Sequence, residues 1–288
     1  MSLSVVVIVG CGGAGAMAPL DGVDTGTDPD AGSMAPDAAE AGATLSHCPA
    51  EPDVHGAISA HVRWSAGIAF CIDGTEVTNA AYATFLAATV ATGTQGPRCA
   101  WNKTFVPETI STNGPTCPVF DAKGRPNDPV VCIDWCDADA YCRWAGKHLC
   151  QTPGGGIVKA ITAKNASEWV IACTGDGAGK YPYGNTPTVG RCVDRQFPAP
   201  TPGLRPVKEA NMCEGGVAGL FDMSGNAWEW HDDCVEKAGA GGEDTCTVIG
   251  GSFSSELATA TCTDTAPFFR KQVAGDTGFR CCADADFF

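Results

Sequence analysis

Seventeen cysteines in 288 residues constrain this chain more than any other feature. Thiols at this density pair as disulfides in an oxidising compartment and are rare in a reducing cytosol. Zinc clusters are the alternative, but the chain has no CxxC, Cys132 and Cys136 lie four apart, and its five histidines show no paired helical spacing. The pattern therefore predicts an exported, disulfide-rich protein. Cys281 and Cys282 are neighbours, so we expect them to bond to different partners.

An odd number of cysteines leaves one without a disulfide partner, and the N-terminus suggests a role for it. An apolar run over residues 3–9 leads into Ile8-Val9-Gly10-Cys11, which resembles a bacterial lipobox. Residues 1–11 would then be a signal peptide with lipobox, and Cys11 would carry lipid, leaving sixteen cysteines for up to eight disulfides. The run is shorter than the roughly 20 residues that span a bilayer, so the membrane is reached by the lipid anchor only. Gly12 favours sorting to the outer membrane of the cell envelope, facing the periplasm or the cell surface; an arbitrary apolar N-terminus is the alternative.

The charge is concentrated near the N-terminus. The net charge is −15, and eight acidic residues precede Arg63, which is the first basic residue. A phosphate backbone would be repelled, so nucleic acid is not an expected partner. Residues 12–46 are mostly Ala, Gly, Asp and Pro and cannot bury enough apolar surface to fold, which predicts an acidic flexible tether. The globular domain is expected over 47–288.

From Cys48 onward, short apolar runs alternate with Gly, Pro and Asn. Three short helices are expected: one after Thr78, one after Asp134 and one within residues 164–173. The rest reads as loops and short strands. The fold class is therefore predicted to be α+β with low regular secondary structure.

Several segments, in order, resemble the formylglycine-generating enzyme (sulfatase-modifying factor) family. They are "FCIDGTEVTNAAYATFL" (70–86), "PVVCIDWCDADAYCRWAGKHLC" (129–150), "GLFDMSGNAWEW" (219–230), "VIGGSF" (248–253) and "GDTGFRC" (275–281). The resemblance implies a duplicated variant of the C-type lectin fold. One block departs from the family, because "QTPGGGIVKAITAK" (151–164) is inserted before "NASEWVIAC" and remodels a loop that would face the ligand.

The resemblance also implies one structural calcium ion. The positions that match its ligands are the side chains of Asp222 and Glu229 and the carbonyls of Gly225 and Ala227. Calcium takes six to eight oxygen ligands, and a tight turn with glycine can supply two carbonyls beside two carboxylates. The alternative is that Glu229 caps the turn without a metal. No second ion is predicted.

Copper is not expected. In the family's enzymes two cysteines five residues apart, just after the GGS motif, bind Cu(I), and soft thiolates suit that ion. Here the motif is Gly250-Gly251-Ser252, and the thiolate positions fall on Ser255 and Ala260. The resemblance further implies two disulfides. They are Cys142–Cys281 and, with Cys262 displaced by about three residues, Cys173–Cys262.

Three functions remain open. The first is a catalytically degenerate module that binds a peptide, protein or glycan in a groove near Trp228, Ser252, Ser255 and the insertion. The second is an enzyme: a copper-dependent, cysteine-oxidising (formylglycine-generating) oxidoreductase, or a relative in which Ser255 and Glu256 act with a distant His231. An isolated Ser–Glu pair in a Gly-rich loop is ordinarily solvated surface. The third is a structural envelope protein. We favour the binding module.

Overall fold

The computed structural model describes residues 48, 59–63, 69–153, 167–175, 179–237, 239 and 241–285. The lipobox with Cys11, the tether and residues 154–164 of the insertion lie outside this part of the chain. All the described residues belong to the second of two units, which covers residues 46–288. None of the helices described is both long and apolar enough to cross a bilayer.

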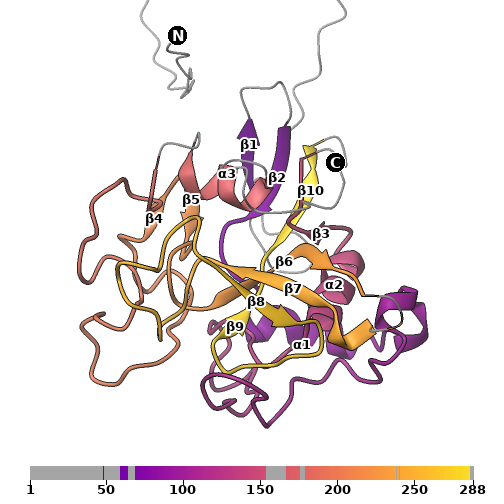
Figure 1. The fold of residues 1–288 in the computed structure, drawn as a ribbon. Coiled ribbons are helices and arrows are strands. Elements are labelled where there is room, and N and C mark those ends of the chain that lie inside the picture. Colours follow the sequence, from indigo (N-terminus) through magenta and orange to yellow (C-terminus); the bar gives the residue numbers. More distant parts are fainter. Residues whose placement is uncertain are drawn as a thin grey trace, which may run out of the picture. The chain divides into compact units, whose positions relative to one another are not determined.

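Short strands build two four-stranded sheets and a two-stranded one (Figure 1). In the first sheet the order is β1 (Ser59–Arg63), β2 (Ala69–Asp73), β10 (Cys281–Asp284), β3 (His148–Leu149), all antiparallel. In the second the order is β8 (Thr265–Phe269), β7 (Thr245–Ile249), β6 (Trp228–Val235), β9 (Thr277–Gly278). Only the β6–β9 pair of that sheet is parallel. The small sheet pairs β4 (Glu214–Gly215) with β5 (Val217–Phe221).

The three expected helices are present. They are α1 (Asn79–Ala87), α2 (Trp135–Trp144) and α3 (Glu168–Thr174), and three single-turn 3₁₀ helices cover Thr92–Thr94, Pro97–Cys99 and Gly241–Glu243. Each α-helix begins after a side-chain cap, at Thr78, Asp134 and Ser167. Gly175 ends α3 in the left-handed region at φ 73°.

Aromatic packing joins the helices to the sheets. Tyr82 of α1 stacks on Tyr141 of α2 with ring centroids 5.7 Å apart, and its hydroxyl donates to the Phe105 carbonyl at 2.7 Å. Trp230 of β6 donates its indole N–H to the Ile133 carbonyl at 3.1 Å, which fixes the second sheet against the start of α2. In Figure 1, α1 and α2 lie together and α3 lies beside β2 and β5.

Eight disulfides connect all sixteen described cysteines. They are Cys48–Cys71, Cys99–Cys136, Cys117–Cys132, Cys142–Cys281, Cys150–Cys282, Cys173–Cys262, Cys192–Cys213 and Cys234–Cys246. Both pairs implied by the resemblance are among them, and the neighbours Cys281 and Cys282 bond to different partners. The α+β class with little regular structure is as expected. Cys117–Cys132 and Cys192–Cys213 each join two loop segments, and the other six have at least one cysteine in a helix or strand.

Candidate functional site

The turn over residues 222–229 and the GGS loop form one unit. The Gly225 amide donates to the Gly250 carbonyl at 3.0 Å, and the Phe253 amide donates to the Asn226 carbonyl at 2.9 Å. Gly250 is in the left-handed region at φ 94°, and a Cβ there would lie 3.0 Å from the Trp169 ring and 3.3 Å from the Met223 carbonyl oxygen of the turn. Glycine at this position therefore lets the two segments approach closely.

Two serine hydroxyls of the GGS loop donate hydrogen bonds to one carboxylate outside the loop. Ser252 and Ser254 each donate to the same oxygen of Asp276 at 2.7 Å, and their hydroxyl oxygens lie 2.9 Å apart. The Ser255 hydroxyl accepts a hydrogen bond from the Ser252 amide at 3.0 Å. Ser252 and Asp276 are buried. The loop is thus held by its own polar side chains, and its hydroxyls already have partners.

The two positions that hold copper thiolates in the family's enzymes lie side by side here. Gly251 has φ 79°, and a Cβ on it would meet the Ala260 Cβ at 3.0 Å and the Ser255 hydroxyl at 3.2 Å. Both positions therefore lie next to the same glycine. Neither side chain offers a thiolate, and every described cysteine is in a disulfide.

The alternative in which Ser255 acts as a nucleophile with Glu256 and His231 is not supported by the contacts of these side chains. Glu256 is paired with the exposed Arg195 at 2.5 Å, while the Ser255 hydroxyl accepts from a backbone amide. His231 is fully buried, and neither of its ring nitrogens has a hydrogen-bond partner. Nucleophilic catalysis needs a base within hydrogen-bond reach of the nucleophile. These three side chains are not linked in that way.

His231 is expected to make the fold sensitive to acid. Burial lowers its pKa to about 4, against an ordinary value near 6.5. The ring is neutral in the folded protein, so its contribution is complete above pH 6.5 and is lost as the pH falls from 6.5 through 4, by about 3 kcal/mol. The His231→Phe variant removes this dependence, and urea unfolding of both proteins at pH 7 and pH 4 measures the difference. Identical pH profiles would contradict the assignment.

Glu229 lies at the centre of a buried ionic network. Arg280 binds both of its oxygens, at 2.7 and 2.8 Å, and the Trp169 indole donates to it at 2.7 Å. Glu76 and Asp222 lie close enough to this pair to interact electrostatically with it. Burial, and next the Asp222 charge, raise the pKa of Glu76 well above its ordinary value. Three buried carboxylates thus share one arginine.

Two members of this network, Glu76 and Arg280, have no role that the sequence alone predicts. Glu76 and Arg280 both lie within the segments that carry the resemblance, "EVTN" and "GFRC". A lone Glu and a lone Arg more than 200 residues apart carry no pattern that predicts their electrostatic interaction.

Only some of the residues expected to bind calcium have an oxygen atom available for the ion. No described residue donates a hydrogen bond to the Gly225 or Ala227 carbonyl, and Asp222 uses one oxygen to accept from the Lys208 amide at 2.7 Å. Burial raises the pKa of Asp222 to about 6, which a bound cation would reverse. Glu229 fits less well, because Arg280 and Trp169 already occupy both of its oxygens. Three of the four expected ligands therefore have an oxygen available.

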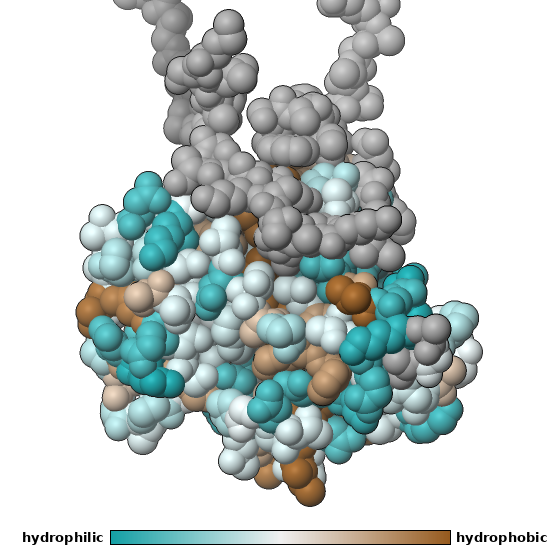
Figure 2. All heavy atoms as spheres, viewed as in Figure 1, coloured by the Kyte–Doolittle hydropathy of each residue, from teal (hydrophilic) through white to brown (hydrophobic). Residues whose placement is uncertain are grey.

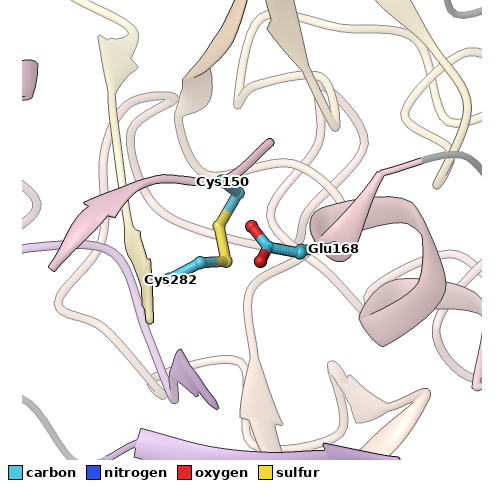
Figure 3. A group of neighbouring side chains, drawn as sticks. All are labelled: Cys150, Glu168 and Cys282. Atoms are coloured by element: carbon cyan, nitrogen blue, oxygen red, sulfur yellow. A yellow bond between two sulfur atoms is a disulfide. The ribbon is translucent and has the colours of Figure 1, made fainter. Parts of the chain in front are cut away.

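A second cluster resembles a metal site but is not one. Cys150, Cys282 and Glu168 lie with their sulfur and oxygen atoms within 4.8 Å of one another, the one such group of His, Cys, Asp or Glu among the described residues. Figure 3 shows the two sulfurs joined as a disulfide beside the carboxylate. Disulfide sulfur is not a thiolate ligand. Glu168 instead accepts from the Gln151 amide at 2.9 Å and bonds to His148 at 3.1 Å, which ties α3 to β3.

Two relevant cavities open on the described surface. One of about 350 Å³ is lined by Gly96, Pro97, Arg98, Cys99, Trp135, Asp139, Arg143, Gln151 and Asp232. The other, of about 330 Å³, adjoins the GGS loop and is lined by Thr116, Pro118, Arg125, Thr201, Pro202, Gly203, Leu204, Arg205, Phe253 and Gly275. Of the expected groove residues, Ser252 and Ser255 lie within two residues of the lining residue Phe253, but neither they nor Trp228 line this cavity. On the face in Figure 2, apolar residues occur in small groups separated by hydrophilic ones.

Comparison with solved structures shows the fold. The chain superposes on the structure of PvdO from Pseudomonas aeruginosa with a TM-score of 0.52 and 18% identity, covering 76% of this chain and 81% of that one.

Sequence comparisons place the chain among its relatives. It is 30% identical to the formylglycine-generating enzyme of Streptomyces coelicolor over 58% of this chain and 56% of that enzyme, so it spans little more than half of that enzyme's length. It is 28% identical to the formylglycine-generating enzyme of Thermomonospora curvata over 75% of this chain and 82% of that enzyme. It is 32% identical to the "Inactive C-alpha-formylglycine-generating enzyme 2" of Mus musculus over 38% of this chain and 34% of that protein. The family described as "Sulfatase-modifying factor enzyme 1-like domain" matches residues 40–285. This protein therefore belongs to the sulfatase-modifying factor (formylglycine-generating enzyme) family.

Proposed function

We propose that this family member is a ligand-binding module that does not carry out copper-dependent cysteine oxidation. The observation that carries the proposal is the pair Ser255 and Ala260, which flank Gly251 where a thiolate pair is needed. The sixteen described cysteines are all committed to disulfides and offer no replacement. A relative whose name calls it inactive supports the same direction. Copper chemistry with unusual ligands is the alternative.

A copper titration tests this proposal. Wild-type protein should not compete with a Cu(I) chelator, because hydroxyl and methyl groups are poor ligands for this soft ion. The Ser255→Cys/Ala260→Cys variant should gain one Cu(I) site, since both positions flank the same glycine. Each single variant serves as a matched control and should bind copper much more weakly than the double variant. Stoichiometric Cu(I) binding by the wild type, with turnover on a cysteine-containing peptide, would overturn the proposal.

We also propose one structural calcium ion at Asp222, Gly225 and Ala227, with Glu229 contributing only if it releases a donor. The charge imbalance around Arg280 supports a cation there. A ligand that binds only the folded state raises the melting temperature, so excess EGTA should lower it and calcium should restore it. Asp222→Ala, which removes both side-chain oxygens, should melt at the same temperature with and without EGTA. A wild-type melting curve that EGTA leaves unchanged would refute the ion.

We further propose that the domain is displayed from the outer membrane by lipid on Cys11. The sequence "IVGC" supports this proposal. Replacing Cys11 with Ser should abolish incorporation of radiolabelled palmitate and release the protein from the membrane fraction. Equal labelling of wild type and variant would refute the anchor.

A further inference from the structure

A single buried asparagine, Asn226, holds in place two of the loops that line the cavity beside the GGS loop. The Asn226 side-chain oxygen accepts from the Arg205 amide at 3.0 Å, and its amide group donates to the Arg205 carbonyl at 3.3 Å. The Asn226 carbonyl accepts from the Phe253 amide at 2.9 Å. Arg205 and Phe253, from two different loops, are therefore positioned by the same fully buried residue. The cavity walls are fixed relative to one another.

The two charged side chains that line the cavity are both basic, and each also pairs with a carboxylate, Arg125 with Asp128 and Arg205 with Glu209. These two arginines are the cavity's only charged lining residues, in a chain with net charge −15. The remaining lining residues are glycines, threonines and apolar side chains. A pocket of one sign concentrates ligands of the other sign.

Arg205 retains unused donor capacity. One of its terminal nitrogens donates to the Thr201 carbonyl, and its other terminal nitrogen makes no hydrogen bond with a described residue. Its Nε is buried and is not accessible to a ligand. The Glu209 carboxylate lies 3.9 Å from that Nε, beyond hydrogen-bond range. Arg125 is half-exposed and uses one terminal nitrogen for Asp128. Guanidinium groups bind carboxylates through paired N–H donors, so these two arginines can take an anionic group.

The apolar lining narrows the class of ligand. Pro118, Leu204 and Phe253 lie in the same cavity of about 330 Å³ as the two arginines. Such a lining suits a molecule with an apolar side chain next to a carboxylate. We propose that this cavity binds the carboxylate of an apolar acyl-amino acid, in free form or as the C-terminal residue of a peptide. This inference rests on the proposed binding function and names its ligand class.

A pair of isosteric probes tests the proposal. N-acetyl-L-leucine should bind at least about tenfold more tightly than N-acetyl-L-leucinamide in calorimetry, because only the acid forms charge-assisted hydrogen bonds with the arginines. Arg205→Gln and Arg125→Gln should each reduce this preference, with folding verified by the melting temperature. Arg143→Gln changes the net charge equally, at an exposed position on α2, and should leave it intact.

Further measurements show whether the carboxylate comes from a peptide or from a free acyl-amino acid. They also show whether a negative result overturns the ligand class or the proposed function. Tighter binding of Ac-Ala-Ala-Leu than of N-acetyl-leucine assigns the site to peptide C-termini, and equal binding assigns it to free acyl-amino acids. Equal binding of acid and amide, both weakened by Phe253→Ala, would overturn the anionic specificity and leave the binding module standing. No binding of either probe would also overturn the inference. Copper-dependent turnover would instead overturn the proposed function itself.

Discussion

Removing the disulfides Cys142–Cys281 and Cys150–Cys282 together should destabilise the protein by about 1 kcal/mol more than the sum of the two single removals. Cys281 adjoins Cys282, and Cys142 and Cys150 are eight positions apart. Each bridge therefore leaves the other closing a loop of only about ten residues. Loop-closure entropy gives about 3 kcal/mol for such a loop. Once one bridge is absent, the remaining bridge closes a loop of about 50 residues by way of Cys173–Cys262. Removing that bridge as well therefore costs about 4 kcal/mol.

Urea unfolding of serine variants measures this coupling. Removing either bridge alone is expected to cost about 3 kcal/mol, and removing both about 7 kcal/mol. Cys234–Cys246 joins β6 to β7 and closes an independent short loop, so its removal together with Cys142–Cys281 should be additive. Strict additivity for the neighbouring pair would show that the two bridges do not share a loop in the unfolded chain.

Replacing Arg280 with Met should lower the free energy of unfolding by about 3–5 kcal/mol. The variant leaves Glu229 without its ionic partner in a site where both side chains are almost fully buried. It also removes the favourable interaction of the Arg280 charge with Glu76 and Asp222, and leaves Asp222 only the weaker interaction with Lys208. The carboxylates can then remain only in their neutral form, so the loss should be larger at pH 8 than at pH 5. Chemical denaturation at the two pH values measures both effects.

An exposed ion pair supplies the matched control. Arg195 and Glu256 are both more than half exposed, and exposed pairs contribute little because water and salt screen them. Arg195→Met should change the unfolding free energy by less than about 1 kcal/mol. Glu229→Gln should approach the cost of Arg280→Met, since it removes the same pair from the other side. Equal small losses for Arg280→Met and Arg195→Met would contradict the buried network.

Local signals in the sequence were sufficient for the helices. Thr78 and Asp134 cap α1 and α2 because their side chains accept backbone N–H groups within the next turn, a contact that spans only three residues. The neighbouring cysteines 281 and 282 also bond to different partners, as expected. Assigning six of the eight disulfides was beyond the sequence, because connectivity depends on how distant loops fold together.

The sequence predicts where the candidate site lies better than it predicts which side chains contact one another there. The GGS motif and Asp222 to Glu229 do meet, through the Gly225–Gly250 hydrogen bond. The commitment of Glu229 to Arg280 was not foreseen, because an arginine 51 residues away has no spacing that links it to the turn. The serines that close the GGS loop on Asp276 were missed for the same reason.

A count of free thiols tests the central claim most directly. The oxidised protein lacking residues 1–11 is denatured without reductant, alkylated and weighed intact by mass spectrometry. With all sixteen remaining cysteines in disulfides, the mass should show no alkylated thiol. Two alkylated cysteines, reproducibly at the same positions, would reveal a thiolate pair able to bind copper and would contradict the account.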